Sequence, residues 1–321
     1  LLKEINEKGD GFNFTNEYLM RCCLVLTDLP VLFKVNSFKS ENVQTIKNEW
    51  SKIAEAIKTT VKLLVDFGFS KSLLTSQNAT IIIAYYIYKG GEINPEIKLD
   101  IKKYLIHSLL NLIYGSSQDQ VINVFRNAIN KSVKFSFNEL LKIELPSRKS
   151  LFISHSELEK LLLEKKGERT FFILSLLYPN LKYSEVDFHQ DHIHPDSRFS
   201  EQEFEKIGLS VEERKEWNDL KDMVPNLQLM EGRQNESKNA SYFLTWLFQK
   251  SKNEQEHFKS SNYIPKDVSL EFKDFKLFFE SRKILLKNAL EKVLAIRDDF
   301  VSKEDKENVQ IPEVVDEEIE N

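Results

Sequence analysis

The chain has 321 residues, 41% of them hydrophobic, and a formal net charge of −5. A chain of this length buries roughly 75% of the surface that its unfolded form exposes, so it can form two domains or more. With 9 Gly and 8 Pro it is poor in turn residues, which argues against many short strands and favours a mainly α fold. The longest apolar run, Ile81 to Tyr88, is well short of the ~20 residues that cross a bilayer, so we expect no membrane partner.

The start of the chain and its cysteines bear on the cellular setting. Residues 1–5, LLKEI, carry charges early and lack an initiating Met, so we expect no signal peptide and a native protein that extends upstream. The two cysteines are adjacent, Cys22 and Cys23, a spacing that builds neither a disulfide framework nor a four-cysteine zinc site. We therefore expect a reduced, cytoplasmic protein in which both cysteines pack inside a helix.

Residues 1–166 are predicted to form an α-helical domain. After Ser40, which suits an N-cap, apolar residues recur at three- and four-residue steps as far as Leu64, and Gly68 suits the C-terminal end. We interpret this stripe as a seam that faces the core. Further segments show the pattern of helices, except that the last fits either a helix or a strand: 79–89, 98–114, 118–131, 156–165 and 170–178.

The pattern changes in the second half, where β-favouring residues begin to alternate. Strands are predicted over 182–193 and 224–230. The stretch between them, 199–220, is polar and is expected to be a helical insertion. Ser210 and Glu213 have the spacing of a capping box at the start of a helix in this insertion.

The order strand, strand, helix predicts a small α+β module over residues 167–260, in which the helix opens near Asn235. A closing helix within 261–301 is expected to pack on the body of the protein. Residues 302–321 hold eight acids against two lysines, which gives this segment a charge of −6 and leaves +1 for the rest of the chain. We predict a disordered acidic tail and a near-neutral body whose basic clusters can bind a nucleic-acid backbone.

One set of polar residues follows the two predicted strands and the helix after them: Asp191-His192-Ile193-His194-Pro195, then Asn226, then Asn235-Glu236-Ser237-Lys238. Hydrolysis of a phosphodiester needs an activated water, neutralised charge on the phosphoryl oxygens and a stabilised leaving oxygen. A histidine with its ordinary pKa of ~6.5 is largely neutral at neutral pH and can accept a proton. Carboxylate and amide oxygens are ligands that Mg²⁺ takes alongside water and phosphate. The set therefore suits metal-dependent cleavage of nucleic acid.

The geometry of the strand and of the helix adds a condition to this interpretation. Because neighbouring residues on a regular strand face opposite sides, Asp191 and His192 converge on one phosphate only if the strand ends or bends there. Pro195 is consistent with such an end, since proline cannot continue a central ladder. Asn235 and Lys238 are three residues apart and share a face if both are helical, in which case Lys238 can touch a phosphate beside the metal.

These residues carry a resemblance to a known family. The span from about Thr170 to Trp246 resembles the ββα-metal, or His-Asn-His, nuclease module of GmrSD-type restriction endonucleases, on the Asp-His, Asn and Asn-x-x-Lys set. Two helical segments, EINEKGDGFNFTNEYLMRCCLVLTDL and SLLTSQNATIIIAYYIYKG, look like the helical region of that family. The segment FFESRKILLKNAL looks like its closing helix, so the resemblance covers nearly the whole chain.

The resemblance implies a role for each residue of the set. Asp191 and Asn235 are the implied protein ligands of a Mg²⁺ or Mn²⁺ ion, and His192 is the implied general base. Asn226 is implied to hold the loop between strand and helix, and Lys238 to support the phosphate. The implied activity is a divalent-metal-dependent DNA endonuclease that restricts foreign, often modified, DNA.

Full-length relatives in this family begin with a nucleotide-binding-like domain that bears an Asp-Gly-Gln-Gln-Arg type of motif. Neither that motif nor a Gly-rich phosphate loop occurs in this sequence. Nucleotide dependence is therefore not carried over. The implied partners are DNA and an N-terminal nucleotide-binding-like domain or partner subunit.

Several alternatives stay open at this point. The chain could be a non-catalytic helical interaction module of a multi-component defence complex, with a vestigial nuclease fold, or an RNA nuclease that uses the same chemistry. His189, His192 and His194 offer a zinc site but lack a fourth ligand at a good spacing. His194 and Arg233 are further candidates for a phosphate contact, whereas three other histidines are expected at the surface or in packing: His107, His155 and His257.

Overall fold

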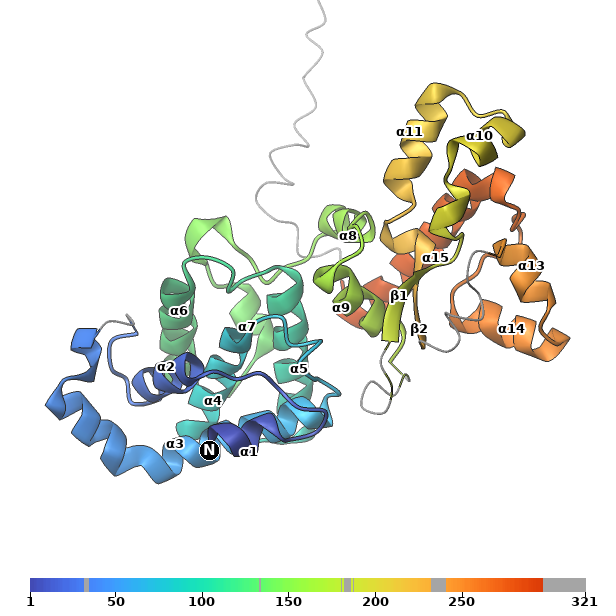
Figure 1. Ribbon diagram of the computed structural model, residues 1–321. Helices are drawn as coiled ribbons and strands as arrows, with labels where there is room; N and C mark the ends of the chain where they lie inside the picture. Colours follow the sequence, from blue (N-terminus) through green and yellow to red (C-terminus); the bar gives the residue numbers. More distant parts are fainter. Residues whose placement is uncertain are drawn as a thin grey trace, which may run out of the picture.

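The computed structural model describes residues 1–31, 35–132, 134–179, 181, 186, 188–231 and 241–296. This part of the chain is mainly helical and holds a two-stranded antiparallel sheet, as the low content of Gly and Pro predicts (Figure 1). None of its helices has the length and apolar character needed to cross a membrane. Four predictions lie outside the described residues: Asn235, Lys238, Arg233 and the acidic tail 302–321.

Helices of the first half surround one short apolar helix, α4. In chain order the helices are α1 (Leu2–Asn6), α2 (Asn16–Leu26), α3 (Ser40–Asp66), α4 (Ile81–Tyr88), α5 (Pro95–Leu110), α6 (Gln118–Lys131), α7 (Phe137–Leu141), α8 (His155–Leu162) and α9 (Glu168–Leu177). α4 is apolar on every side, and α2, α3 and α6 pack against it. The apolar segment 170–178, which fitted either a helix or a strand, is part of helix α9. Cys22 and Cys23 are buried in α2, as predicted.

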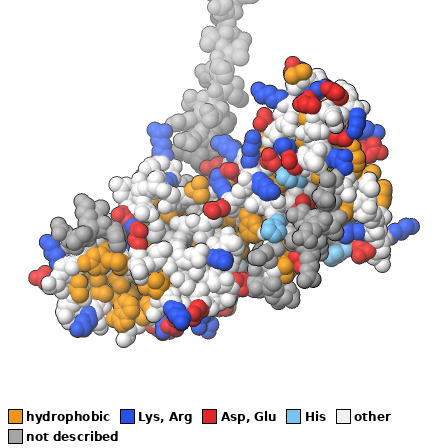
Figure 2. Space-filling model, viewed as in Figure 1, with side chains coloured by type: hydrophobic (Ala, Val, Ile, Leu, Met, Phe, Trp, Pro, Cys, Tyr) orange, Lys and Arg blue, Asp and Glu red, His pale blue; other side chains and the backbone are white. Residues whose placement is uncertain are grey.

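α3 departs from its prediction at its start. Ser40 is its first residue, and the N-cap is Lys39, which makes no side-chain cap bond. Gly68 follows its C-terminal end in the left-handed region at φ +81°. The second half of the apolar stripe is buried, but Val43 and Trp50 are 46% and 43% exposed. α3 has 27 residues, about 40 Å, and cannot be covered along its length by α4 with 8 residues. Hydrophobic side chains gather in this region of the surface (Figure 2).

The second half contains the sheet and the remaining helices. Its elements are β1 (Phe188–His192), α10 (Glu201–Ile207), α11 (Val211–Leu220), β2 (Leu227–Glu231), α13 (Phe243–Phe248), α14 (Lys252–Ser261) and α15 (Phe275–Leu294). The strands pair antiparallel, with Phe188 opposite Glu231 and His192 opposite Leu227. The predicted capping box at the start of α11 is present: Ser210 and Glu213 each accept a bond from the other's backbone N–H. β1 ends at His192, and such an end is what allows Asp191 and His192 to converge on one phosphate.

Short 3₁₀ helices connect several of these elements: η1 (Val35–Phe38), η2 (Gln77–Thr80), η3 (Pro146–Arg148), η4 (Asp196–Arg198), η5 (Val224–Asn226) and η6 (Phe272–Asp274). Of these, η5 matters most for the site because it leads directly into β2.

The buried apolar residues form two clusters. The first, which we call the large core, takes residues from α1 to α9, from β2 and from the last turns of α15. The second, the aromatic core, consists mostly of rings: Phe199, Phe204, Trp217, Phe243, Trp246, Phe272, Phe275, Phe278 and Phe279. α15 contributes its first turns to the aromatic core and its last turns to the large core, so it belongs to both (Figure 1). The domain boundaries at residues 166, 260 and 301 stay predictions.

Candidate functional site

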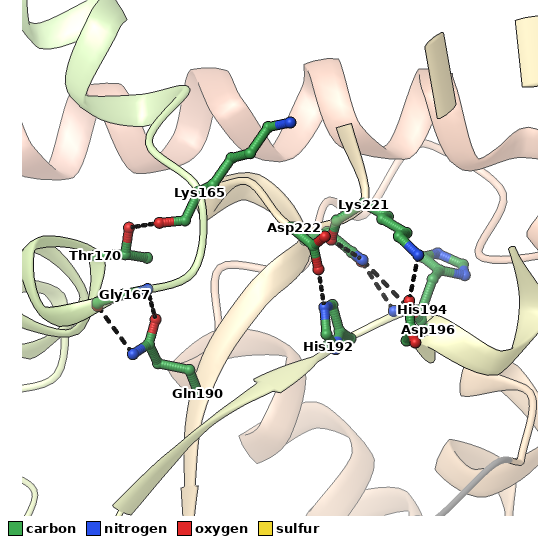
Figure 3. A network of polar contacts seen from close by, with 10 residues as sticks. Lys165, Gly167, Thr170, Gln190, His192, His194, Asp196, Lys221 and Asp222 are labelled. Atoms are coloured by element: carbon green, nitrogen blue, oxygen red, sulfur yellow. Dashed lines mark hydrogen bonds and ion pairs between the residues drawn. The ribbon is translucent and has the colours of Figure 1, made fainter. Parts of the chain in front are cut away.

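The candidate site lies where β1 ends and meets the chain that follows α11. His192 Nε2 lies 2.7 Å from Asp222 Oδ1, and the two side chains are 13% and 35% exposed (Figure 3). An ionised carboxylate can only accept a hydrogen bond, so Nε2 carries the proton that it donates. In the neutral ring the lone pair then lies on Nδ1, the nitrogen suited to take a proton.

Asp191, the residue before His192, has a different partner. Its Oδ2 accepts a bond of 2.9 Å from Nε2 of Gln228, which lies directly opposite on β2 and is fully buried. Asp191 and His192 therefore bond to separate segments of the chain. Within the described ranges no group of three or more His, Cys, Asp or Glu is placed to hold a metal ion.

The donor chemistry at Asp191 is nevertheless compatible with a divalent cation. A carboxylate has about four lone-pair sites, and the bond from Gln228 uses one of them. Hydrogen bonds of this kind orient carboxylates that ligate metals. Asp191 thus offers a hard oxygen ligand, and the predicted second ligand, Asn235, lies outside the described residues.

Asn226 bonds the turn after β1 to the segment before β2. It is fully buried. Its Oδ1 accepts the His194 N–H at 2.9 Å, and its Nδ2 donates to the carbonyls of His194 at 3.1 Å and Lys221 at 2.8 Å. Its own carbonyl accepts the Ile193 N–H at 2.7 Å. The residue thus holds the turn beyond His192, which is a different loop from the one that follows β2.

His194 does not lie where a phosphate could reach it. It is 1% exposed, and its ring packs against Phe243, Phe272, Phe275 and Phe278 with centroid separations of 4.7 to 6.1 Å. The candidate phosphate contact at His194 is therefore wrong. The prediction fails because the turn after β1 directs the His194 side chain into the aromatic core.

Charges of both signs surround the His192–Asp222 pair. Lys221 Nζ lies 2.5 Å from Asp196 Oδ1 and holds the pKa of the Asp196 carboxyl below its usual range. His192 and Lys166 contribute to that lowered pKa from a greater distance. Lys, Arg and acidic side chains lie beside histidines in the middle of the face in Figure 2.

A buried arginine supports the segment that carries Asn226. Arg282 of α15 is fully buried. Its guanidinium donates to the carbonyls of Pro225 at 2.6 Å, Leu227 at 2.9 Å and Asn262 at 3.1 Å. Burial lowers its pKa. These bonds connect the closing helix to η5 and β2.

Sequence reasoning gave no role to three residues that hold the predicted ones: Asp222, Gln228 and Arg282. The last two lie within segments that carry the family resemblance. Asp222 lies four residues before Asn226, in a stretch rich in acids that gives no reason to single it out. The position of Gln228 within the second predicted strand was the one usable signal, because a residue facing Asp191 follows once the register is known. The chain matches no protein-family model and no curated protein sequence.

Proposed function

We propose that this protein is a divalent-metal-dependent DNA endonuclease whose active site is a ββα-metal module formed by β1, β2 and the helix after them. The observation that carries the proposal is the His192–Asp222 pair, held at the end of β1 beside Asp191. A histidine fixed by a buried or half-buried carboxylate is the usual arrangement of a general base.

In the proposed reaction His192 Nδ1 takes a proton from the attacking water. Asp222 keeps the ring oriented and stabilises the imidazolium that forms, because its carboxylate accepts the Nε2–H bond. Asn226 fixes the turn beyond His192, so the base stays in place as it gains charge. Correct placement of a catalytic group accounts for several kcal/mol of a typical barrier reduction, about 7–11 in favourable cases.

Asp191 would hold the cation, with Asn235 as its second protein ligand. When bound, a Mg²⁺ or Mn²⁺ ion supplies charge neutralisation at the phosphoryl and leaving oxygens. Gln228 keeps the Asp191 carboxylate oriented through its amide. Lys238 is proposed as a supporting phosphate contact.

The resemblance to GmrSD-type restriction endonucleases supports the same proposal and suggests foreign or modified DNA as substrate. It also suggests an N-terminal nucleotide-binding-like domain or subunit as partner. The buried bonds around Asn226 and Gln228 favour an enzyme over a non-catalytic interaction module, since they hold residues that such a module would not need to orient.

Cleavage of supercoiled plasmid with Mg²⁺ or Mn²⁺, with and without EDTA, tests the proposal. We expect His192→Ala to lower the rate by about 10²–10⁴-fold, as loss of a general base does. His189→Ala is the matched control, because His189 is an exposed histidine three residues earlier on the same strand. Equal rates for wild type and His192→Ala would contradict the catalytic assignment, and faster cleavage of labelled RNA than of DNA would favour the RNA nuclease.

A further inference from the structure

The loop between α8 and α9 runs beside the segment that carries Asp222. The Lys166 N–H donates to the Asp222 carbonyl at 2.8 Å, and the Val224 N–H donates to the Glu164 carbonyl at 3.2 Å. Lys165 and Met223 form an antiparallel bridge between these two bonds. The loop from the helical half therefore forms a short ladder with the chain that leads into β2.

The bridge places the backbone of Lys166 against that of Asp222, the residue whose carboxylate bonds to His192. The two residues are joined by the 2.8 Å bond from the Lys166 N–H to the Asp222 carbonyl. Lys166 is exposed, so its side chain starts beside the candidate site and reaches into solvent. In Figure 3 the side chain of the neighbouring Lys165 points away from His192.

Lys166 also differs from the neighbouring lysines in its pairing. Lys165 lies 3.3 Å from Asp219, and Lys221 lies 2.5 Å from Asp196. The exposed Lys166 has no carboxylate within ion-pair distance among the residues that the structure describes. Its influence on the pKa of Asp196, after the larger effect of Lys221, agrees with an ammonium close to the site.

A second set of bonds fixes the loop against β1. The Gly167 N–H donates to Gln190 Oε1 at 3.1 Å, and Gln190 Nε2 donates back to the Gly167 carbonyl at 3.0 Å (Figure 3). The Thr170 hydroxyl donates to the Lys165 carbonyl at 2.6 Å. Gln190 lies two residues before His192 on the same strand. The backbone around Lys166 is thus bonded to the Asp222 segment on one side and to β1 on the other, before any substrate binds.

From this geometry we infer that Lys166 is a phosphate-contacting residue of the site, supplied by the helical half and directed at the backbone of duplex DNA. The inference rests on the proposed function. A lysine ammonium acts on phosphate as a point charge, and it needs no fixed bidentate geometry. The two sets of bonds already order the backbone of Lys166, so binding of DNA reduces the conformational entropy of its side chain only.

Binding of a fluorescein-labelled DNA duplex to the His192→Ala protein tests the inference without cleavage. Each phosphate contact contributes about 0.9 to the slope of log affinity against log salt. We expect Lys166→Ala, added to His192→Ala, to weaken binding and to lower that slope by about 0.9 between roughly 50 and 200 mM salt. Lys166→Arg should keep most of the slope. Lys131→Ala, an exposed lysine at the end of α6, is the matched control and should change neither quantity.

The outcomes separate the inference from the proposed function. An unchanged affinity and slope in Lys166→Ala, or a parent protein that binds no duplex, overturns the inference. A reduced slope in a protein whose wild type cuts no DNA supports the phosphate contact and overturns the nuclease. Cleavage by wild type and by Lys166→Ala with the same KM supports the nuclease and overturns the contact.

Discussion

The large core and the part of the chain around the candidate site bury polar side chains in different ways. In the large core Thr60 and Ser175 bond to carbonyls three or four residues earlier in their own helices. Around the site Asn226 bonds to a turn 32 residues earlier, and Arg282 to a segment 55 to 57 residues earlier. Local bonds add to helices that form anyway, whereas the distant bonds decide how separate segments meet. The large core also has distant polar bonds, such as that between the Tyr18 and Thr80 hydroxyls, but they join helices. Around the site the distant bonds hold a turn and a 3₁₀ segment, which have few local bonds of their own.

Arg282→Met is expected to cause the largest loss of stability among the variants that test this difference. The substitution removes a costly buried charge but leaves the carbonyls of Pro225, Leu227 and Asn262 buried without their donor. Each abandoned acceptor costs about 1–3 kcal/mol, which outweighs the relief because water cannot replace the donor. We expect the free energy of unfolding, measured with urea, to fall by about 3 kcal/mol.

Thr60→Val is the matched control from the large core. It removes a hydroxyl that donates to the Ala56 carbonyl at 2.8 Å within the same helix. That carbonyl belongs to the interior of α3, so the loss should be about 1 kcal/mol or less. Equal losses in the free energy of unfolding for Arg282→Met and Thr60→Val would contradict the distinction between local and distant bonds.

The next effect in size concerns catalysis. Asp222→Asn keeps the shape of the side chain but replaces the carboxylate that accepts the Nε2–H bond of His192. The amide can donate to Nε2 and so favour the wrong tautomer or displace the ring, and a displacement of about 1 Å costs about 10²-fold in rate. We expect kcat for DNA cleavage to fall by about that factor with little change in unfolding midpoint. Asp219→Asn, an exposed acid in α11, is the control, and a rate for Asp222→Asn that matches it would remove Asp222 from the mechanism.

The smallest expected effect concerns a titratable residue that is buried beside the large core. His107 of α5 is buried, with its ring nitrogens 2.9 Å from the Leu151 carbonyl and 3.2 Å from the Leu294 carbonyl, so it makes distant bonds. Burial lowers its pKa. Below the unfolded value of ~6.5 the unfolded chain then binds more protons, so this contribution is complete above that pH and is lost as the pH falls. The change is at most about 1.4 kcal/mol per pH unit for one proton.

Unfolding by urea at a series of pH values between about 7.5 and 5 measures this contribution. His107→Gln should flatten the decline in stability on acidification. His257→Gln replaces an exposed histidine of α14 and should leave the decline as it is in wild type. A decline that is the same in all three proteins would contradict the assignment to His107.

Local patterns predicted the helices well. The apolar segment that becomes α4, the span of α6 and the capping box of α11 follow from residues within one or two turns of each other. The burial predicted for the first half of the α3 stripe was wrong for a different reason. The stripe continues past the helix that could cover it, and the length of that partner is not encoded in the stripe itself.

The candidate site could be predicted only in part. Asp191, His192 and Asn226 stand out because their types and order suit phosphodiester chemistry. Asp222 and Gln190 became visible only through side-chain bonds to His192 and Gly167, and the contact of Gln228 with Asp191 only through the register of β1 against β2. Register depends on pairings about 35 to 60 residues apart, which periodicity within a window cannot supply.

Because α15 contributes to both cores, the candidate site can assemble only late in co-translational folding. The helix runs to Leu294, and its Arg282 gives η5 and β2 bonds that nothing earlier in the described chain supplies. During synthesis the N-terminal helices can collapse around α4 as they leave the ribosome, since domains fold as they emerge. The turn that carries Asn226 gains its last support only after translation has passed α15. A ribosome-bound chain that ends before this helix should therefore have an unassembled candidate site and a large core that is still open where Leu286, Leu290 and Leu294 pack.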